Sequence, residues 1–162
     1  MALTIGLLVW LGGILLGHVV VPWVISLQTP HHGWTAGRPG AWNLLGLMPL
    51  VAGTVCLMWV MVVGFAEIPE RVELTWPATT LLVRGPFAFT RNPIYVGELG
   101  LWLGWALLYG SLGVFVGFVA IVLIVHFAVL PREERTLEAR FGDIYREYKA
   151  STSRWVCKPA MP

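Results

Sequence analysis

The stretch "RGPFAFTRNPIYVGE", Arg84–Glu98, joins a polar part of a hydrophobic chain to a long apolar run. Its prolines restrict the backbone, and Asn92 suits the N-cap of a helix that begins at Pro93. A helix N-terminus favours anionic groups, and Arg91 adds a full positive charge beside it. The stretch therefore predicts a helix start that serves either as a ligand site or as a capped anchor at the membrane surface.

Composition places this helix start in a membrane protein. The chain has 162 residues, of which 57% are hydrophobic and 12% charged. A soluble domain carries roughly twice that charged fraction. A mean hydropathy of +0.72 and nine tryptophans indicate a small integral membrane protein with one domain, residues 1–162. Two cysteines form neither a disulfide framework nor a metal-binding pattern, so we expect no metal site, and we expect no nucleic-acid partner.

Four uncharged or nearly uncharged runs predict four transmembrane helices, at residues 3–27, 42–66, 93–108 and 114–130. About 20 apolar residues cross a bilayer, so the last two are short. The turn-like cluster Tyr109–Gly113 separates these two and predicts a tight hairpin. The expected fold class is all-α.

The tail, residues 131–162, differs from the rest of the chain. Leu137, Phe141, Ile144, Tyr145 and Tyr148 recur at helical spacing, which predicts a C-terminal amphipathic helix.

The basic residues predict the orientation in the membrane. Arg38 lies alone on one side of the four predicted helices, whereas ten Lys and Arg residues share the side of the two termini. By the positive-inside rule both termini face the cytoplasm, across the plasma or inner membrane in a bacterium or the endoplasmic reticulum membrane in a eukaryote. The ten residues are Arg71, Arg84, Arg91, Arg132, Arg135, Arg140, Arg146, Lys149, Arg154 and Lys158.

Glu98 is the one acidic residue inside these apolar runs. A charged side chain at the bilayer centre costs about 2.5–3.5 kcal/mol, so Glu98 needs a partner or a polar cavity. His126 is one possible partner, and the pair is either catalytic or structural. Gly100 and Gly104 predict close helix packing, while Gly97 either packs in the same way or leaves room for a ligand.

A second polar cluster, Arg132–Arg135, follows the fourth predicted helix. In an antiparallel hairpin it lies level with Arg91 and Pro93, so the two clusters are expected to converge. Arg91, helix-end amides and the carboxylates of Glu133 and Glu134 would suit a zwitterionic ligand, with aromatic walls from Phe87, Phe89 and Tyr95. The other interpretation of the two glutamates is a solvated first turn of the tail helix.

Several short motifs, in this order, resemble one family of enzymes. They are Gly85–Phe87, Arg91–Gly97, Glu133-Glu134, Phe141–Tyr148 and Arg154-Trp155. Their order and spacing, over roughly residues 80–155, are similar to those of the membrane methyltransferases of the isoprenylcysteine carboxyl methyltransferase and phospholipid N-methyltransferase group.

The resemblance implies S-adenosylmethionine as methyl donor and a lipid or lipophilic acceptor with a carboxylate or an amine. Many carboxyl methyltransferases of the group have histidine where this chain has Asn92, and asparagine cannot act as a base. The candidate catalytic residues are Arg91, Glu98 and Glu134, of which Glu98 is not part of the motif. The candidate cofactor-binding residues are Gly85, Phe87, Arg91, Asn92, Pro93, Tyr95, Gly97, Glu133 and Glu134.

Two alternatives remain at this point. The run Asn92–Glu98 also resembles steroid reductase-like membrane oxidoreductases, which use NADPH. A non-enzymatic four-helix scaffold would bind no cofactor and would tolerate substitution of Arg91 and Glu134.

Overall fold

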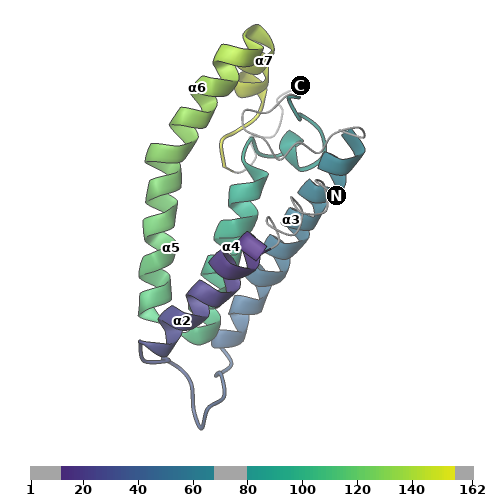
Figure 1. Ribbon diagram of the computed structural model, residues 1–162. Coiled ribbons are helices and arrows are strands. Elements are labelled where there is room, and N and C mark those ends of the chain that lie inside the picture. The colour runs from purple at the N-terminus through teal and green to yellow at the C-terminus, as the bar shows by residue number, and fades with distance from the viewer. Residues whose placement is uncertain (1–11, 68–79, 156–162) are drawn as a thin grey trace. The chain divides into compact units, whose positions relative to one another are not determined.

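The computed structural model describes residues 12–67 and 80–155 (Figure 1). Residues 3–11 of the first predicted helix, Arg71 and Lys158 lie outside this part of the chain. Within it, helices account for all the longer regular elements, and extended pairing is confined to one bridge between Thr35 and Arg38. The all-α prediction therefore holds for the described residues. The elements are η1 (Leu16–Val20), α2 (Val21–Leu27), η2 (Asn43–Gly46), α3 (Leu47–Glu67), η3 (Gly85–Ala88), α4 (Pro93–Tyr109), α5 (Leu112–Ile124), η4 (Val125–Val129), α6 (Leu130–Phe141) and α7 (Asp143–Ser151).

Among the described residues, two helical stretches are long and apolar enough to cross a membrane. One is Asn43–Gly64, and the other is Leu112–Phe141, in which α5, η4 and α6 run on without a break (Figure 1). Only 22% and 11% of their most apolar windows are buried, whereas the core helix of a soluble protein would be mostly buried. Outward-facing apolar side chains on such helices are consistent with a membrane protein. Gly12–Leu27 and α4 are shorter, so the four-span topology stays a prediction.

The tail departs from the predicted single amphipathic helix. Helix α6 continues directly from the apolar helix and ends at Phe141, and α7 begins only at Asp143. Between them Gly142 has a φ of +56°, a backbone conformation that glycine adopts at little cost. This break resets the helical register, so Tyr145 is buried while Ile144 is 66% exposed. The prediction of one continuous amphipathic helix in the tail was therefore wrong, because Gly142 divides it into two helices.

The chain divides into two compact units, residues 1–55 with 97–122 and residues 56–96 with 123–162. In the first unit, the predicted hairpin closes through Gly110 and Ser111 between α4 and α5. Gly110 has a φ of +57°. Trp102, Ala106 and Val114 form the buried core of this hairpin. The tight turn predicted from the Tyr109–Gly113 cluster is therefore confirmed, with α5 starting earlier than expected.

Small residues bring α3 and α4 close together in the first unit. A Cβ on Gly53 would lie 2.6 Å from the carbonyl oxygen of Gly97, and one on Gly104 would lie 2.8 Å from that of Gly46. A Cβ on Gly100 would lie 3.2 Å from a backbone oxygen of α3. The predicted packing role of Gly100 and Gly104 is confirmed, because larger side chains would separate the two helices.

Candidate functional site

The site is built on the segment that leads into α4, in the second unit. Gly85 opens η3 with a φ of +58°, and a Cβ there would lie 2.6 Å from Val63 Cγ2. The carbonyl of Asn92 accepts a hydrogen bond from the amide of Val96 at 3.1 Å, so the helix starts at Pro93 as predicted. The side chain of Asn92 is used elsewhere, because its Nδ2 donates to the carbonyl of Arg154 at 2.9 Å.

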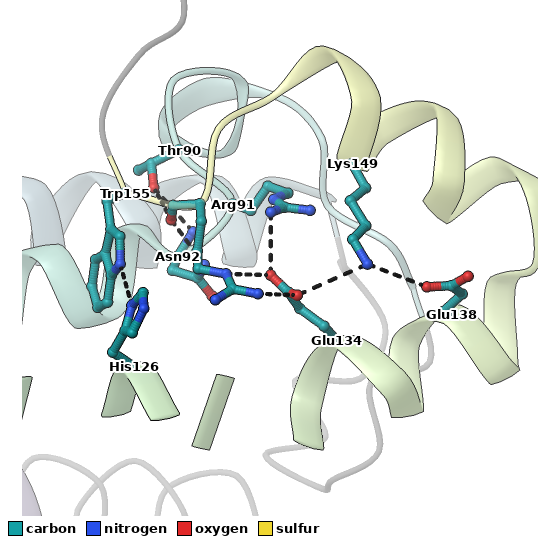
Figure 2. A network of polar contacts seen from close by, with 9 residues as sticks. Thr90, Arg91, Asn92, His126, Glu134, Glu138, Lys149 and Trp155 are labelled. Carbon is teal, nitrogen blue, oxygen red and sulfur yellow. Dashed lines mark hydrogen bonds and ion pairs between the residues drawn. The ribbon is translucent and has the colours of Figure 1, made fainter. Parts of the chain in front are cut away.

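The segment Thr152–Trp155, which we call the strap, lies along the residues before α4 and is anchored by its backbone and its tryptophan (Figure 2). Thr90 Oγ1 and Asn92 Nδ2 both donate to the carbonyl of Arg154, at 3.0 and 2.9 Å. The amide of Arg91 donates to the carbonyl of Ser153 at 2.9 Å, and Trp155 Nε1 donates to His126 Nδ1 at 2.9 Å.

Glu134 stands at the centre of a cluster of cations, to which its carboxylate points in Figure 2. Arg154 Nε lies 2.9 Å from Oε1, and Arg154 Nη2 lies 2.6 Å from Oε2. Arg91 Nη2 lies 3.2 Å from Oε1, and Lys149 Nζ lies 4.0 Å from Oε2. Glu134 is only 6% exposed, and buried carboxylates in folded proteins are paired and hydrogen-bonded in this way.

Arg91 is less well satisfied than Glu134. Its side chain is 9% exposed, and its Nε and Nη1 are buried with no hydrogen-bond partner among the described residues. Buried polar atoms in folded proteins are nearly always hydrogen-bonded. Arg91 and Arg154 share the one carboxylate of Glu134, so two guanidinium groups are paired with a single negative charge.

Two tyrosines of α7 border this cluster without changing its charge. Burial, with the negative charge of Glu134 as a second cause, raises the pKa of Tyr145 to about 12. Burial also raises the pKa of Tyr148, whose hydroxyl donates to the carbonyl of Phe87 at 2.7 Å. Both remain neutral phenols near neutral pH, so they do not offset the positive charge on Arg91.

The second carboxylate of the motif faces α4 as well. Tyr95 Oη donates to Glu133 Oε1 at 2.7 Å, so the first turn of α4 orients Glu133. The structure thus brings Arg91, Asn92 and Tyr95 into the same unit as Glu133 and Glu134, which come much later in the sequence, with direct contacts from Arg91 to Glu134 and from Tyr95 to Glu133. The catalytic or binding roles predicted for them stay predictions.

Two predicted site residues, Gly97 and Glu98, belong to the first unit. There the carbonyl of Gly97 lies against Gly53, and Glu98 Oε1 lies 3.9 Å from Nε2 of His18 in η1. His126, the partner expected for Glu98, accepts a hydrogen bond from Trp155 in the second unit. The Glu98–His126 pair therefore stays a prediction, while each residue has another neighbour that the sequence did not indicate.

Sequence reasoning also missed the parts played by Arg154, Lys149 and Thr90. Arg154-Trp155 carried a signal as the last piece of the motif, but nothing in the sequence indicated that the Arg154 guanidinium reaches Glu134. Lys149 and Thr90 gave no signal, because a lone lysine or threonine in a polar segment is usually solvated.

The comparisons with known proteins agree with the motifs. The phospholipid methyltransferase family matches residues 42–144, and the chain belongs to this family. An uncharacterized protein of Haemophilus influenzae is 35% identical over 63 residues, which are 39% of this chain and the whole of that protein. No solved structure matches the chain. Family membership indicates methyltransferase chemistry, and the matched region contains Arg91, Glu133 and Glu134.

Proposed function

We propose that the chain is an integral membrane methyltransferase that uses S-adenosylmethionine to methylate a lipid or lipophilic acceptor. The observation that carries the proposal is the arrangement at the start of α4. There a buried arginine with two unpartnered guanidinium nitrogens lies beside the carboxylate of Glu134, and Glu133 lies one residue away along α6.

These residues fit the chemistry of the donor. Its amino acid part has a carboxylate, which suits Arg91 and the first amides of α4. Its ammonium group and ribose hydroxyls suit the carboxylates of Glu133 and Glu134, and Tyr95 holds Glu133 in place. Gly85, Phe87, Asn92, Pro93 and Gly97 complete the proposed donor-binding set as residues that shape the segment.

The donor supplies a methyl group on a sulfonium, and transfer is a displacement at that carbon. The chain's residues contribute chiefly by holding the two reactants in line, which is worth several kcal/mol in well-oriented reactions. Arg91 and Glu134 act by positioning the donor. Asn92 cannot accept a proton, and its side-chain amide already holds the strap. An amine acceptor must lose a proton before it attacks, and we assign Glu98 to the acceptor for this reason.

The proposed location follows from charge and hydropathy. Both termini face the cytoplasm, since ten of the eleven Lys and Arg residues lie on their side of the predicted spans. The acceptor then reaches the enzyme from the membrane, and the donor reaches it from the cytoplasm.

Calorimetric titration of the detergent-purified protein with S-adenosylhomocysteine tests the proposal, with NADPH as comparator. We expect saturable binding of S-adenosylhomocysteine that Arg91→Gln abolishes. Arg146→Gln is the matched control, because Arg146 is exposed and contacts only Glu138 and Asp143 among the ion pairs of the described residues. Binding of NADPH alone would support the reductase alternative, and binding of neither would support a scaffold.

A further inference from the structure

The strap contacts the site in two different ways. Its backbone is tied to the segment before α4 through the carbonyls of Ser153 and Arg154, and Trp155 is tied to His126. The side chain of Arg154 is tied only to Glu134 among the described residues, through two charge-assisted hydrogen bonds of 2.9 and 2.6 Å. The contacts of the strap backbone therefore do not depend on the hydrogen bonds between the Arg154 guanidinium and the Glu134 carboxylate.

Glu134 and the two arginines that it contacts differ in their access to water. Those of Arg91 and Glu134 are 9% and 8% exposed, whereas that of Arg154 is 31% exposed. Glu134 raises the pKa of Arg154 through this hydrogen bond, so the guanidinium stays charged. A partly exposed guanidinium regains hydration when it swings outward, while Arg91 is held in the interior. Of the two arginines on Glu134, Arg154 is thus the one that is able to leave, and the more exposed Lys149 lies 4.0 Å away, beyond hydrogen-bond distance.

The hydrogen bonds show which atoms of Glu134 would become available if the Arg154 guanidinium moved away. Both oxygens of Glu134 are engaged by Arg154, and Oε1 is also shared with Arg91. A cation that binds Glu134 must therefore compete with Arg154. If a zwitterion enters, its cationic group replaces the guanidinium on Glu134, and its carboxylate supplies the anion that the unpartnered nitrogens of Arg91 lack.

From these observations we infer that Arg154 is an internal competitor for the cation-binding side of Glu134, displaced by the ammonium group of the methyl donor. The inference rests on the proposed function. In this role Arg154 sets the affinity for the donor. Its guanidinium keeps the buried carboxylate of Glu134 paired in the absence of donor, and it weakens donor binding by the same interaction.

The sign of one substitution tests this role. We expect Arg154→Gln to bind S-adenosylhomocysteine about tenfold more tightly than wild type, because a hydrogen bond to a charged group contributes roughly 1.5 kcal/mol or more. Arg154→Lys keeps the charge but loses the two-point contact, so its affinity should lie between those of wild type and Arg154→Gln. Arg146→Gln removes the same charge from an exposed position and should leave the affinity unchanged.

Hydrogen exchange supplies a readout that does not depend on activity. The amide of Arg91 is bonded to the carbonyl of Ser153, so its protection reports whether the strap backbone stays in place. We expect the same protection in wild type and in Arg154→Gln. Loss of protection in Arg154→Gln would show that the side chain clamps the strap, and the inference would be wrong.

The binding outcomes separate the two levels of the proposal. Wild-type binding that Arg154→Gln weakens or leaves unchanged would overturn the inference and leave the methyltransferase function standing. Binding of S-adenosylhomocysteine by Arg154→Gln but not by wild type would support both the methyltransferase function and the inference. Arg154 would then compete for Glu134 more strongly than expected. Failure of both proteins to bind S-adenosylhomocysteine would reject the donor site, and the role of Arg154 with it.

Discussion

Replacing Glu134 by glutamine should destabilise the protein more than any comparable change in the exposed ion pairs around it. The substitution keeps the shape of the side chain and removes its charge. Arg91, 9% exposed, would then be left without a carboxylate among the described residues. Removing one partner of a buried pair typically costs about 3–5 kcal/mol.

The expected magnitude is smaller than that range for two structural reasons. The amide oxygen of glutamine still accepts one hydrogen bond, and Arg154, 31% exposed, is able to turn toward water. We therefore expect a loss of about 2–3 kcal/mol. At roughly 2–4 °C per kcal/mol for a chain of this size, the melting temperature in detergent should fall by roughly 4–12 °C.

Glu138→Gln is the matched control. Glu138 contacts Arg146 and Lys149, which are 61% and 41% exposed, and such solvated pairs contribute little to stability. Adding Arg91→Met to Glu134→Gln should recover part of the lost stability, because it removes the uncompensated buried charge. Equal melting temperatures for the two glutamine variants, or strictly additive effects of Glu134→Gln and Arg91→Met, would refute this reasoning.

Three further predictions concern other parts of the chain. Glu98→Gln should lower the rate of methyl incorporation into extracted lipids much more than it lowers affinity for S-adenosylhomocysteine; full activity would make Glu98 structural. Because the pKa of Tyr145 is raised to about 12 from an ordinary value of about 10, its neutral form stabilises the fold. That stabilisation is complete below about pH 10 and is lost as pH rises toward 12, so Tyr145→Phe should remove a tyrosinate absorbance step near pH 12; loss of a step near pH 10 instead would contradict the assignment. Gly53→Ala should lower the melting temperature, at a cost of about 1–3 kcal/mol, because its Cβ would meet the carbonyl of Gly97 at 2.6 Å, whereas Gly64→Ala, with open space around it, should not.

The amino-acid sequence determined the features that depend on neighbours along the chain. Asn92-Pro93 predicted the start of α4, because proline fixes its own backbone and restricts the residue before it. Apolar runs predicted α3 and the hairpin of α4 and α5, and small residues predicted where α3 and α4 approach. The order of the motifs also predicted the methyltransferase family, which the match over residues 42–144 confirmed.

The sequence was less informative where a local pattern had two solutions. Phe141, Ile144 and Tyr145 fit one amphipathic helix, yet Gly142 adopts a positive φ and resets the register. Periodicity alone cannot detect such a break, because glycine is tolerated within helices at a modest cost.

Only the tertiary structure decided which charges meet. Glu134 and Arg154 are 20 residues apart, and Arg91 is farther still, so their pairing depends on how α6, the strap and the start of α4 fold together. His18 likewise lies 3.9 Å from Glu98 only because distant helices pack in the first unit. Charged side chains have many possible partners of opposite sign in a sequence. Burial, which leaves two guanidinium nitrogens of Arg91 without a partner among the described residues while Arg154 is 31% exposed, exists only once the chain is folded.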